Sequence, residues 1–156
     1  MKAKKLHSEI MNTYYKGKKI YIEEYKDNTY FLLNDIVMVG IPTNELLFDT
    51  SKITNSLDCG ILKAVMKDSI SNKYEYADLE FFKDVEIRGK KVRIAKLKSE
   101  NYHAYIDAKL LKLFEIDVRF KILGVGKNIL LYENGISEPV GMIATVIINE
   151  KIMEVK

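Results

Sequence analysis

Residues 101–149 constrain the fold of this chain more than any other stretch. A short amphipathic segment is followed by three apolar runs rich in β-branched residues, and glycine-containing turns separate the runs. Apolar residues at helical spacing predict a helix, and strict alternation predicts a half-buried strand. The alternation is strictest over 116–123, where Ile116 opens the clearest strand of the sequence. A helix followed by an antiparallel meander is therefore the expected unit.

The same order of elements occurs near the start of the chain. Leu6, Ile10 and Tyr14 recur every four residues, which predicts a helix over 3–16 with one buried stripe, and Gly17 is suited to end it. Apolar runs at 18–25, 29–33 and 36–41 then predict three strands, the last two joined by a tight turn at Asn34-Asp35. The sequence thus predicts two copies of one unit, at about 3–42 and 105–148.

The second helix is expected to begin at Asp107, which is well placed as a cap. Its inward stripe consists of Ile106, Leu110, Leu113 and Phe114, and Lys109 and Lys112 lie on the opposite side. Two such units can join their sheets edge to edge and place both helices on one face, which buries the two stripes together. We expect an α+β fold in a single domain over 1–156, with a duplicated helix-plus-β-meander unit and an antiparallel sheet.

The middle segment, 43–104, is less regular. A helix is expected over 57–70, and strands over 74–82, 85–88 and 91–97. The apolar residues of the last strand do not alternate perfectly, so a bulge or strand end is expected near Lys96.

The amino-acid composition narrows the classes of protein to which this chain can belong. Apolar residues make up 47% of the chain, enough for one core, and the net charge of +3 does not by itself mark a nucleic-acid binder. Cys59 is the single cysteine, which excludes an intramolecular disulfide and favours a cytoplasmic location. No apolar run is long enough for a signal peptide or a membrane span, so no membrane partner is expected.

Several motifs of the second unit follow one another in a recognisable order. They are Tyr105-Ile106-Asp107, Leu110-Leu111-Lys112-Leu113, Val118-Arg119-Phe120, Leu130-Leu131-Tyr132-Glu133 and the apolar run 143–148. This order resembles the closing half of the repeating domain of sliding clamps, the ring-shaped processivity factors of DNA polymerases. The resemblance implies a DNA-clamp-like fold and a non-enzymatic, DNA-associated role without a cofactor.

Two features depart from that family. The final strand lacks the methionine-proline pair and following basic residue with which bacterial clamps often end. Family members also carry two or three such domains in one chain, whereas this chain has room for one, so a ring would need about six copies as a homo-oligomer. The resemblance implies double-stranded DNA and a polymerase or another replication protein as partners. A lysine-rich, single-domain version suggests a phage or mobile-element protein.

The resemblance places the helices toward DNA, so their exposed lysines are the expected phosphate contacts. These residues are Lys2, Lys4, Lys5, Lys109 and Lys112, with Lys16, Lys18 and Lys19 as a second cluster. The competing explanation is that these lysines solvate two helix faces, since lysine is the usual exposed residue there.

Other candidate sites are weaker. His7 and His103 lack partners at metal-ligand spacing, Cys59 lacks a catalytic histidine motif, and 124–127 lacks the spacing of a phosphate loop. The acidic residues of 78–86 fit a solvated strand face better than a metal site. Tyrosines in the first unit could stack on single-stranded nucleic acid, although strand tyrosines more often pack against their neighbours.

Two other functions stay open. The first is a protein-binding module that keeps the duplicated fold without binding DNA, because one fold hosts many functions. The second is a small enzyme, which would require a concave pocket with convergent polar groups.

Overall fold

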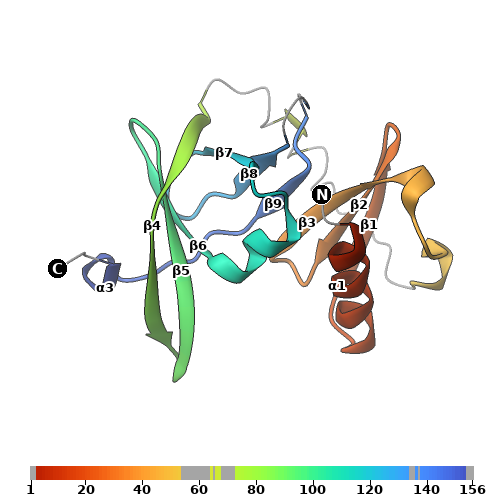
Figure 1. The fold of residues 1–156 in the computed structure, drawn as a ribbon, viewed down its shortest axis with the longest axis horizontal. Coiled ribbons are helices and arrows are strands. Elements are labelled where there is room, and N and C mark those ends of the chain that lie inside the picture. Colours follow the sequence, from red (N-terminus) through yellow and green to blue (C-terminus); the bar gives the residue numbers. More distant parts are fainter. Residues whose placement is uncertain are drawn as a thin grey trace.

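The computed structural model describes residues 3–53, 64, 66–67, 73–133, 136 and 138–153. Within these residues, nine strands form one antiparallel sheet in the order β1-β2-β3-β9-β8-β7-β4-β5-β6 (Figure 1). The expected α+β class and antiparallel sheet are therefore confirmed. Among the described residues, no helix has the length and apolar character needed to cross a membrane.

The first unit follows the sequence pattern closely. Helix α1 (Ala3–Tyr15) is followed by the meander of β1 (Ile20–Tyr25), β2 (Asn28–Leu33) and β3 (Val37–Pro42). Gly17 has a φ of 68°, the left-handed conformation expected where a helix ends. Asn34 and Asp35 have φ values of 53° and 58°, which confirms the predicted turn between β2 and β3.

The segment expected to form the second unit is built of shorter elements. It consists of the 3-10 helix η3 (Ala108–Leu113) and strands β7 (Arg119–Ile122), β8 (Ile129–Tyr132) and β9 (Gly141–Ile143). Asp107 caps η3 as predicted, because its side chain accepts a hydrogen bond from the Lys109 N–H. Ile106 lies in the preceding strand rather than in the helix, so that part of the predicted stripe was wrong.

The predicted strand over 116–123 begins three residues late. The Val118 N–H donates to the Glu115 carbonyl in a turn, and Ile116 is 98% exposed. The register explains the difference, because β7 has partner residues on β8 only from Arg119 onward. The expected final strand over 140–148 is likewise confined to β9, which pairs with β3 and β8. Alternation alone does not show where a partner strand ends.

The middle segment forms β4 (Glu75–Ile87) and β5 (Lys90–Lys98), followed by β6 (His103–Asp107). The strands expected at 74–82 and 85–88 are thus one long strand. Its register shifts between Leu79 and Phe81, which face Leu97 and Lys96. The irregularity expected near Lys96 therefore lies directly across from it on β4. β4 pairs with β7 up to Ala77 and with β5 from Asp78 onward.

The two units meet along β3 and β9, whose register pairs Val37 with Ile143, Met38 with Met142 and Val39 with Gly141. This seam lies in the middle of the sheet (Figure 1). The Ala144 N–H extends it by donating to the Ile36 carbonyl at 2.8 Å. The units are therefore held by main-chain hydrogen bonds as well as by side-chain packing.

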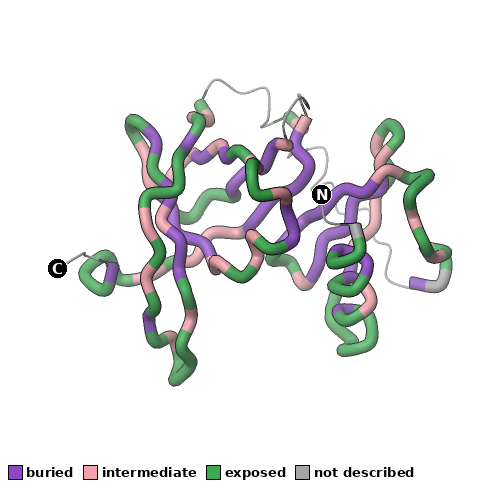
Figure 2. The backbone as a smooth tube through the Cα atoms, in the orientation of Figure 1, coloured by how far each residue is buried: buried purple, intermediate pink, exposed green. Residues whose placement is uncertain are grey.

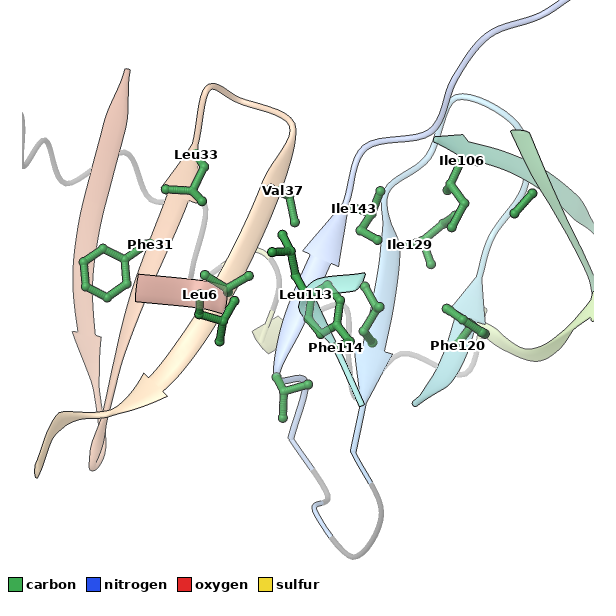
Figure 3. Close-up of a cluster of buried hydrophobic side chains, with 14 of the residues drawn as sticks. Leu6, Phe31, Leu33, Val37, Ile106, Leu113, Phe114, Phe120, Ile129 and Ile143 are labelled. Atoms are coloured by element: carbon green, nitrogen blue, oxygen red, sulfur yellow. The ribbon is translucent and has the colours of Figure 1, made fainter. Parts of the chain in front are cut away.

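One face of the sheet carries the main core, and both α1 and η3 contribute to it. Leu6 of α1 and the pair Leu113 and Phe114 at η3 lie over the central strands in one cluster with Phe31 and Ile143 (Figure 3). Figure 2 shows the buried backbone concentrated in the middle of the sheet, whereas much of β4 and the outer side of α1 is exposed. Leu6 and Ile10 of the first predicted stripe are thus buried together with Leu113 and Phe114 of the second. Tyr14 is 37% exposed, so that part of the first predicted stripe was wrong.

The opposite face carries a smaller cluster that includes Tyr30, Leu32, Met38, Leu130, Tyr132 and Met142. Two short 3-10 helices, η1 (Thr43–Glu45) and η2 (Thr50–Lys52), follow β3, and helix α3 (Glu150–Met153) follows β9. The helix expected over 57–70 lies outside the described residues except for 64, 66 and 67, which are helical. Cys59 and Lys2 also lie outside them.

Candidate nucleic-acid interface

A groove between α1 and η3 brings together the predicted phosphate-binding residues. Its volume is about 460 Å³, and its lining comprises Lys4, Lys5, Ser8, Glu9, Lys109, Leu110, Lys112 and Leu113. The two helical elements, α1 and η3, are far apart in the sequence. The fold therefore joins four of the five predicted lysines at one surface, which we call the lysine groove.

The local structure of each element explains why these side chains share one surface. In α1, Lys4, Lys5 and Ser8 are exposed, whereas Leu6 and Ile10 face the core. In a 3-10 helix, residues three apart lie directly above one another. Lys109 and Lys112 are therefore aligned on the solvent side of η3. The change from the expected α-helix to a 3-10 helix preserves this alignment.

The lysine groove has an excess of positive charge. Four lysines line it, and Glu9 is the carboxylate among the lining residues. Lys109 Nζ lies 3.5 Å from Asp107 Oδ2, and the Lys109 side chain is 75% exposed. An exposed pair of this kind is weak and screened by salt, so it leaves Lys109 able to exchange its partner for a phosphate.

The second lysine cluster does not belong to the groove. Lys16 lies just beyond the opposite end of α1, about 18 Å from Lys4 along the helix axis. Lys18 and Lys19 are exposed beside it, and Lys19 Nζ is 4.0 Å from Asp35 Oδ2. The sequence thus predicted two clusters, and the structure places only the first beside η3.

A second groove, of about 450 Å³, lies between β4, η3 and β7 and is mainly apolar. Leu79, Phe82 and Ile116 are on its lining and are 40%, 41% and 98% exposed. Lys112 lines this groove as well as the lysine groove, so the two are neighbours across η3. Sequence analysis did not predict the apolar groove, because β4 and β7 become neighbours only through the sheet.

Both histidines serve packing contacts. His7 Nε2 accepts a hydrogen bond from the Leu47 N–H at 3.2 Å, and its ring packs edge-on against Phe48. His103 Nε2 lies 2.8 Å from Glu150 Oε1. Within the part of the chain that the structure describes, no group of three or more His, Cys, Asp or Glu side chains is arranged to hold a metal ion.

The acidic residues of β4 face cations on β5. Glu80 Oε2 lies 3.2 Å from Lys96 Nζ, and Asp84 Oδ2 lies 3.6 Å from Lys91 Nζ. These pairs agree with the solvated strand face that we expected from the sequence.

The tyrosines of the first unit do not form one stacking surface. Tyr30 is buried, and its hydroxyl donates to the Pro139 carbonyl at 3.0 Å. Burial raises the pKa of Tyr30 to about 12. Tyr14 and Tyr15 contact each other, whereas Tyr21 and Tyr25 pack against the smaller cluster on the sheet face opposite α1.

The shifted carboxyl pKa values arise from contacts that hold a turn and the C-terminal segment. Hydrogen bonds from Asn101 and Ser99 lower the pKa of Glu75, which fixes the turn between β5 and β6. Hydrogen bonds from Tyr105 and His103 lower the pKa of Glu150. Both carboxylates have structural partners, and neither lines the lysine groove.

Comparison with known proteins gives no further assignment. A scan against protein-family models and searches of curated proteins and of solved structures found no match to this chain. The function of the molecule must therefore be inferred from its own geometry.

Proposed function

We propose that this protein is a non-enzymatic accessory factor that binds double-stranded DNA through the lysine groove, in the manner of one sliding-clamp domain. The observation that carries the proposal is the convergence of Lys4, Lys5, Lys109 and Lys112 on one groove from two distant parts of the chain. Solvation alone does not require lysines on separate elements to gather at one surface. Each lysine that neutralises a phosphate releases counterions and adds a sequence-independent contribution to binding.

The sheet topology supports a duplicated, clamp-like unit. Each meander follows its own helical element, and the meanders join through their last strands, β3 and β9, in antiparallel pairing. A twofold rotation through this seam would exchange β1-β2-β3 with β7-β8-β9. The difference in length between α1 and η3 is the main departure from such symmetry.

The test is DNA binding by a charge-reversed variant of the groove, Lys4→Glu with Lys109→Glu and Lys112→Glu. Binding of a labelled DNA duplex is measured by fluorescence anisotropy across a salt series. Each lost phosphate contact should reduce the slope of log affinity against log salt by about 0.9, so the slope should fall by roughly three units. Affinity at low salt should fall together with the slope.

A charge-matched control changes three exposed lysines away from the groove, Lys90→Glu, Lys98→Glu and Lys127→Glu. This control should retain most of the salt slope, because only net charge changes. An equal loss of salt slope and of affinity in both variants would show that the protein binds DNA through its overall charge. Absence of duplex binding by the wild-type protein at low salt would overturn the proposal directly.

The apolar groove supports a second candidate, a module that binds a protein partner. Leu79, Phe82 and Ile116 expose apolar surface around a concavity, as protein-binding sites often do. This candidate, a module without a DNA-binding role, is favoured if the wild-type protein does not bind the duplex but captures a purified protein partner, and if Ile116→Asp abolishes that capture. A polymerase processivity subunit or loader is the first partner to test.

A further inference from the structure

On the face of the sheet opposite α1 and η3, two cations surround an exposed tyrosine. The Tyr76 ring has Lys121 Nζ at 4.8 Å and Arg119 Cζ at 5.3 Å from its centroid. Lys121 Nζ also lies 5.0 Å from the Tyr132 ring centroid, and the two tyrosine rings are 6.4 Å apart. We call these residues the Tyr76 cluster.

The sheet register explains how the cluster forms. Tyr76 faces Lys121 across β4 and β7, and Arg119 faces Tyr132 across β7 and β8. Their neighbours Ala77, Phe120 and Leu131 belong to the main core with Leu113. Because side chains alternate along a strand, Tyr76 and Lys121 point to the face away from the lysine groove. Arg119, at the start of β7, also lines the apolar groove.

The cluster leaves both an aromatic surface and positive charge available. Tyr76 is 56% exposed, whereas Tyr132 is 2% exposed. The buried Tyr132 ring packs beneath the Lys121 side chain. Among the described residues, the contacts of the Arg119 and Lys121 side chains are with aromatic rings, and neither cation is in an ion pair. Asp78, two residues after Tyr76 on the same strand, is a neighbouring carboxylate, and the register pairs it with Lys98 of β5.

We propose that the Tyr76 cluster binds single-stranded nucleic acid. A base stacks on the exposed part of the Tyr76 ring, and the flanking phosphates are neutralised by Arg119 and Lys121. Proteins that bind single strands without sequence preference combine these two features, an aromatic platform and cations along the backbone path. A duplex does not offer an unstacked base, so this site prefers single strands. The proposal is independent of the lysine groove.

The test is the binding of a labelled oligothymidylate, measured by fluorescence anisotropy, to the wild-type protein and to Tyr76→Ala. Loss of one stacked base should weaken binding about fivefold to a hundredfold. Tyr76→Phe keeps the ring and should bind within about twofold of the wild type. Circular dichroism of each variant verifies the fold, and the half-exposed position of Tyr76 makes both substitutions tolerable.

Three further variants test the two cations and whether the effect is specific to the position of Tyr76. Arg119→Gln and Lys121→Gln should each reduce the salt slope for single strands by about 0.7. Tyr15→Ala removes an even more exposed tyrosine, 76% exposed, that lies on α1, and it should leave binding unchanged.

Several outcomes would overturn the proposal. They are unchanged binding by Tyr76→Ala, equal weakening by Tyr15→Ala, and equal affinity of the wild type for oligothymidylate and a polyglutamate peptide. Equal affinity for the polyglutamate peptide would show that Arg119 and Lys121 bind acidic protein segments as well as they bind nucleic acid. The charge-reversed groove variant should still bind oligothymidylate at Tyr76 while losing duplex binding, so each of the two proposals can fail separately.

Discussion

At the residue scale, Gly141 shows how closely the two halves of the molecule approach. A Cβ atom at this position would lie 2.4 Å from the Met38 carbonyl oxygen and 2.6 Å from a ring carbon of Phe114. Met38 belongs to β3, and Phe114 follows η3. The absence of a side chain at Gly141 thus lets η3 pack directly on the seam between the two meanders.

Gly141→Ala should therefore destabilise the protein. The backbone oxygen of Met38 cannot move without breaking the seam, so we expect a loss of about 1–3 kcal/mol in the free energy of unfolding. Chemical denaturation followed by circular dichroism measures it. Gly126→Ala is the control, because a Cβ atom at Gly126 would have no other atom within 4 Å. Any loss of stability in this variant comes only from placing alanine at a φ of 80°. A smaller loss for Gly141→Ala than for Gly126→Ala would contradict the packing explanation.

At the element scale, the segment after β9 is hydrogen-bonded to β6 and packs against the face formed by β4 and β5. The Val146 N–H donates to the Tyr105 carbonyl at 2.8 Å, and Met153 is 2% exposed in a cluster with Val85 and Ile94. Glu150 completes the attachment by accepting a hydrogen bond from the Tyr105 hydroxyl. Burial and this bond raise the pKa of Tyr105, which keeps its hydroxyl protonated as a donor.

This attachment should depend on pH through Glu150. Its pKa is lower in the folded protein than in the unfolded chain, because the hydrogen bonds from Tyr105 and His103 favour the carboxylate. The ionised Glu150 carboxylate therefore stabilises the folded protein fully at pH values above the unfolded pKa of about 4.3. This stabilisation is lost as the pH falls through the lower folded pKa. At neutral pH, Glu150→Gln should reduce the free energy of unfolding by about 0.2–1 kcal/mol, since the side chain is half exposed.

Urea denaturation at several pH values tests this prediction. The difference between wild type and Glu150→Gln should shrink toward zero in acid. Glu100→Gln, at an exposed position, provides the control for removing one negative charge. A difference that is constant across the whole pH range would assign the effect to packing rather than to ionisation.

At the scale of the whole molecule, the two ends of the sheet differ. β6 ends one side, and the segment after β9 already donates a hydrogen bond to its outer edge. β1 ends the other side and, among the described strands, pairs only with β2. The Asn34 N–H donates to the Lys19 carbonyl at 2.8 Å, which sets the alternation so that the Glu24 N–H points outward. Self-assembly by strand addition would thus use β1.

Glu24→Pro should block such assembly without breaking the bonds between β1 and β2. Proline removes an N–H that faces outward on an edge strand, a position where it is tolerated. If copies of the chain associate through β1, light scattering across protein concentrations should show a mass that falls to the monomer in this variant. Glu24→Ala retains the N–H and should associate like the wild type. Equal masses for the two variants would exclude β1 as the contact.

Much of the local structure was predictable from the sequence. The stripe of Leu6 and Ile10, the stop at Gly17, the turn at Asn34 and Asp35 and the cap at Asp107 were all predicted correctly. Each depends on residues within a few positions of one another, so the chain itself carries the signal. The lysines were expected as phosphate contacts for a different reason, because the family resemblance placed both helices toward DNA.

The candidate sites depended on contacts that no local pattern contains. Strand pairing across large separations in the chain determines the start of β7, the single long β4, the convergence of Lys4 with Lys109, and the approach of Tyr76 to Lys121. By itself, the sequence determined which segments are helical or extended and which of their faces are apolar, because those properties repeat at fixed spacing. Only the tertiary structure decided which faces meet, because the order of strands in the sheet is set by the burial of all the apolar faces together.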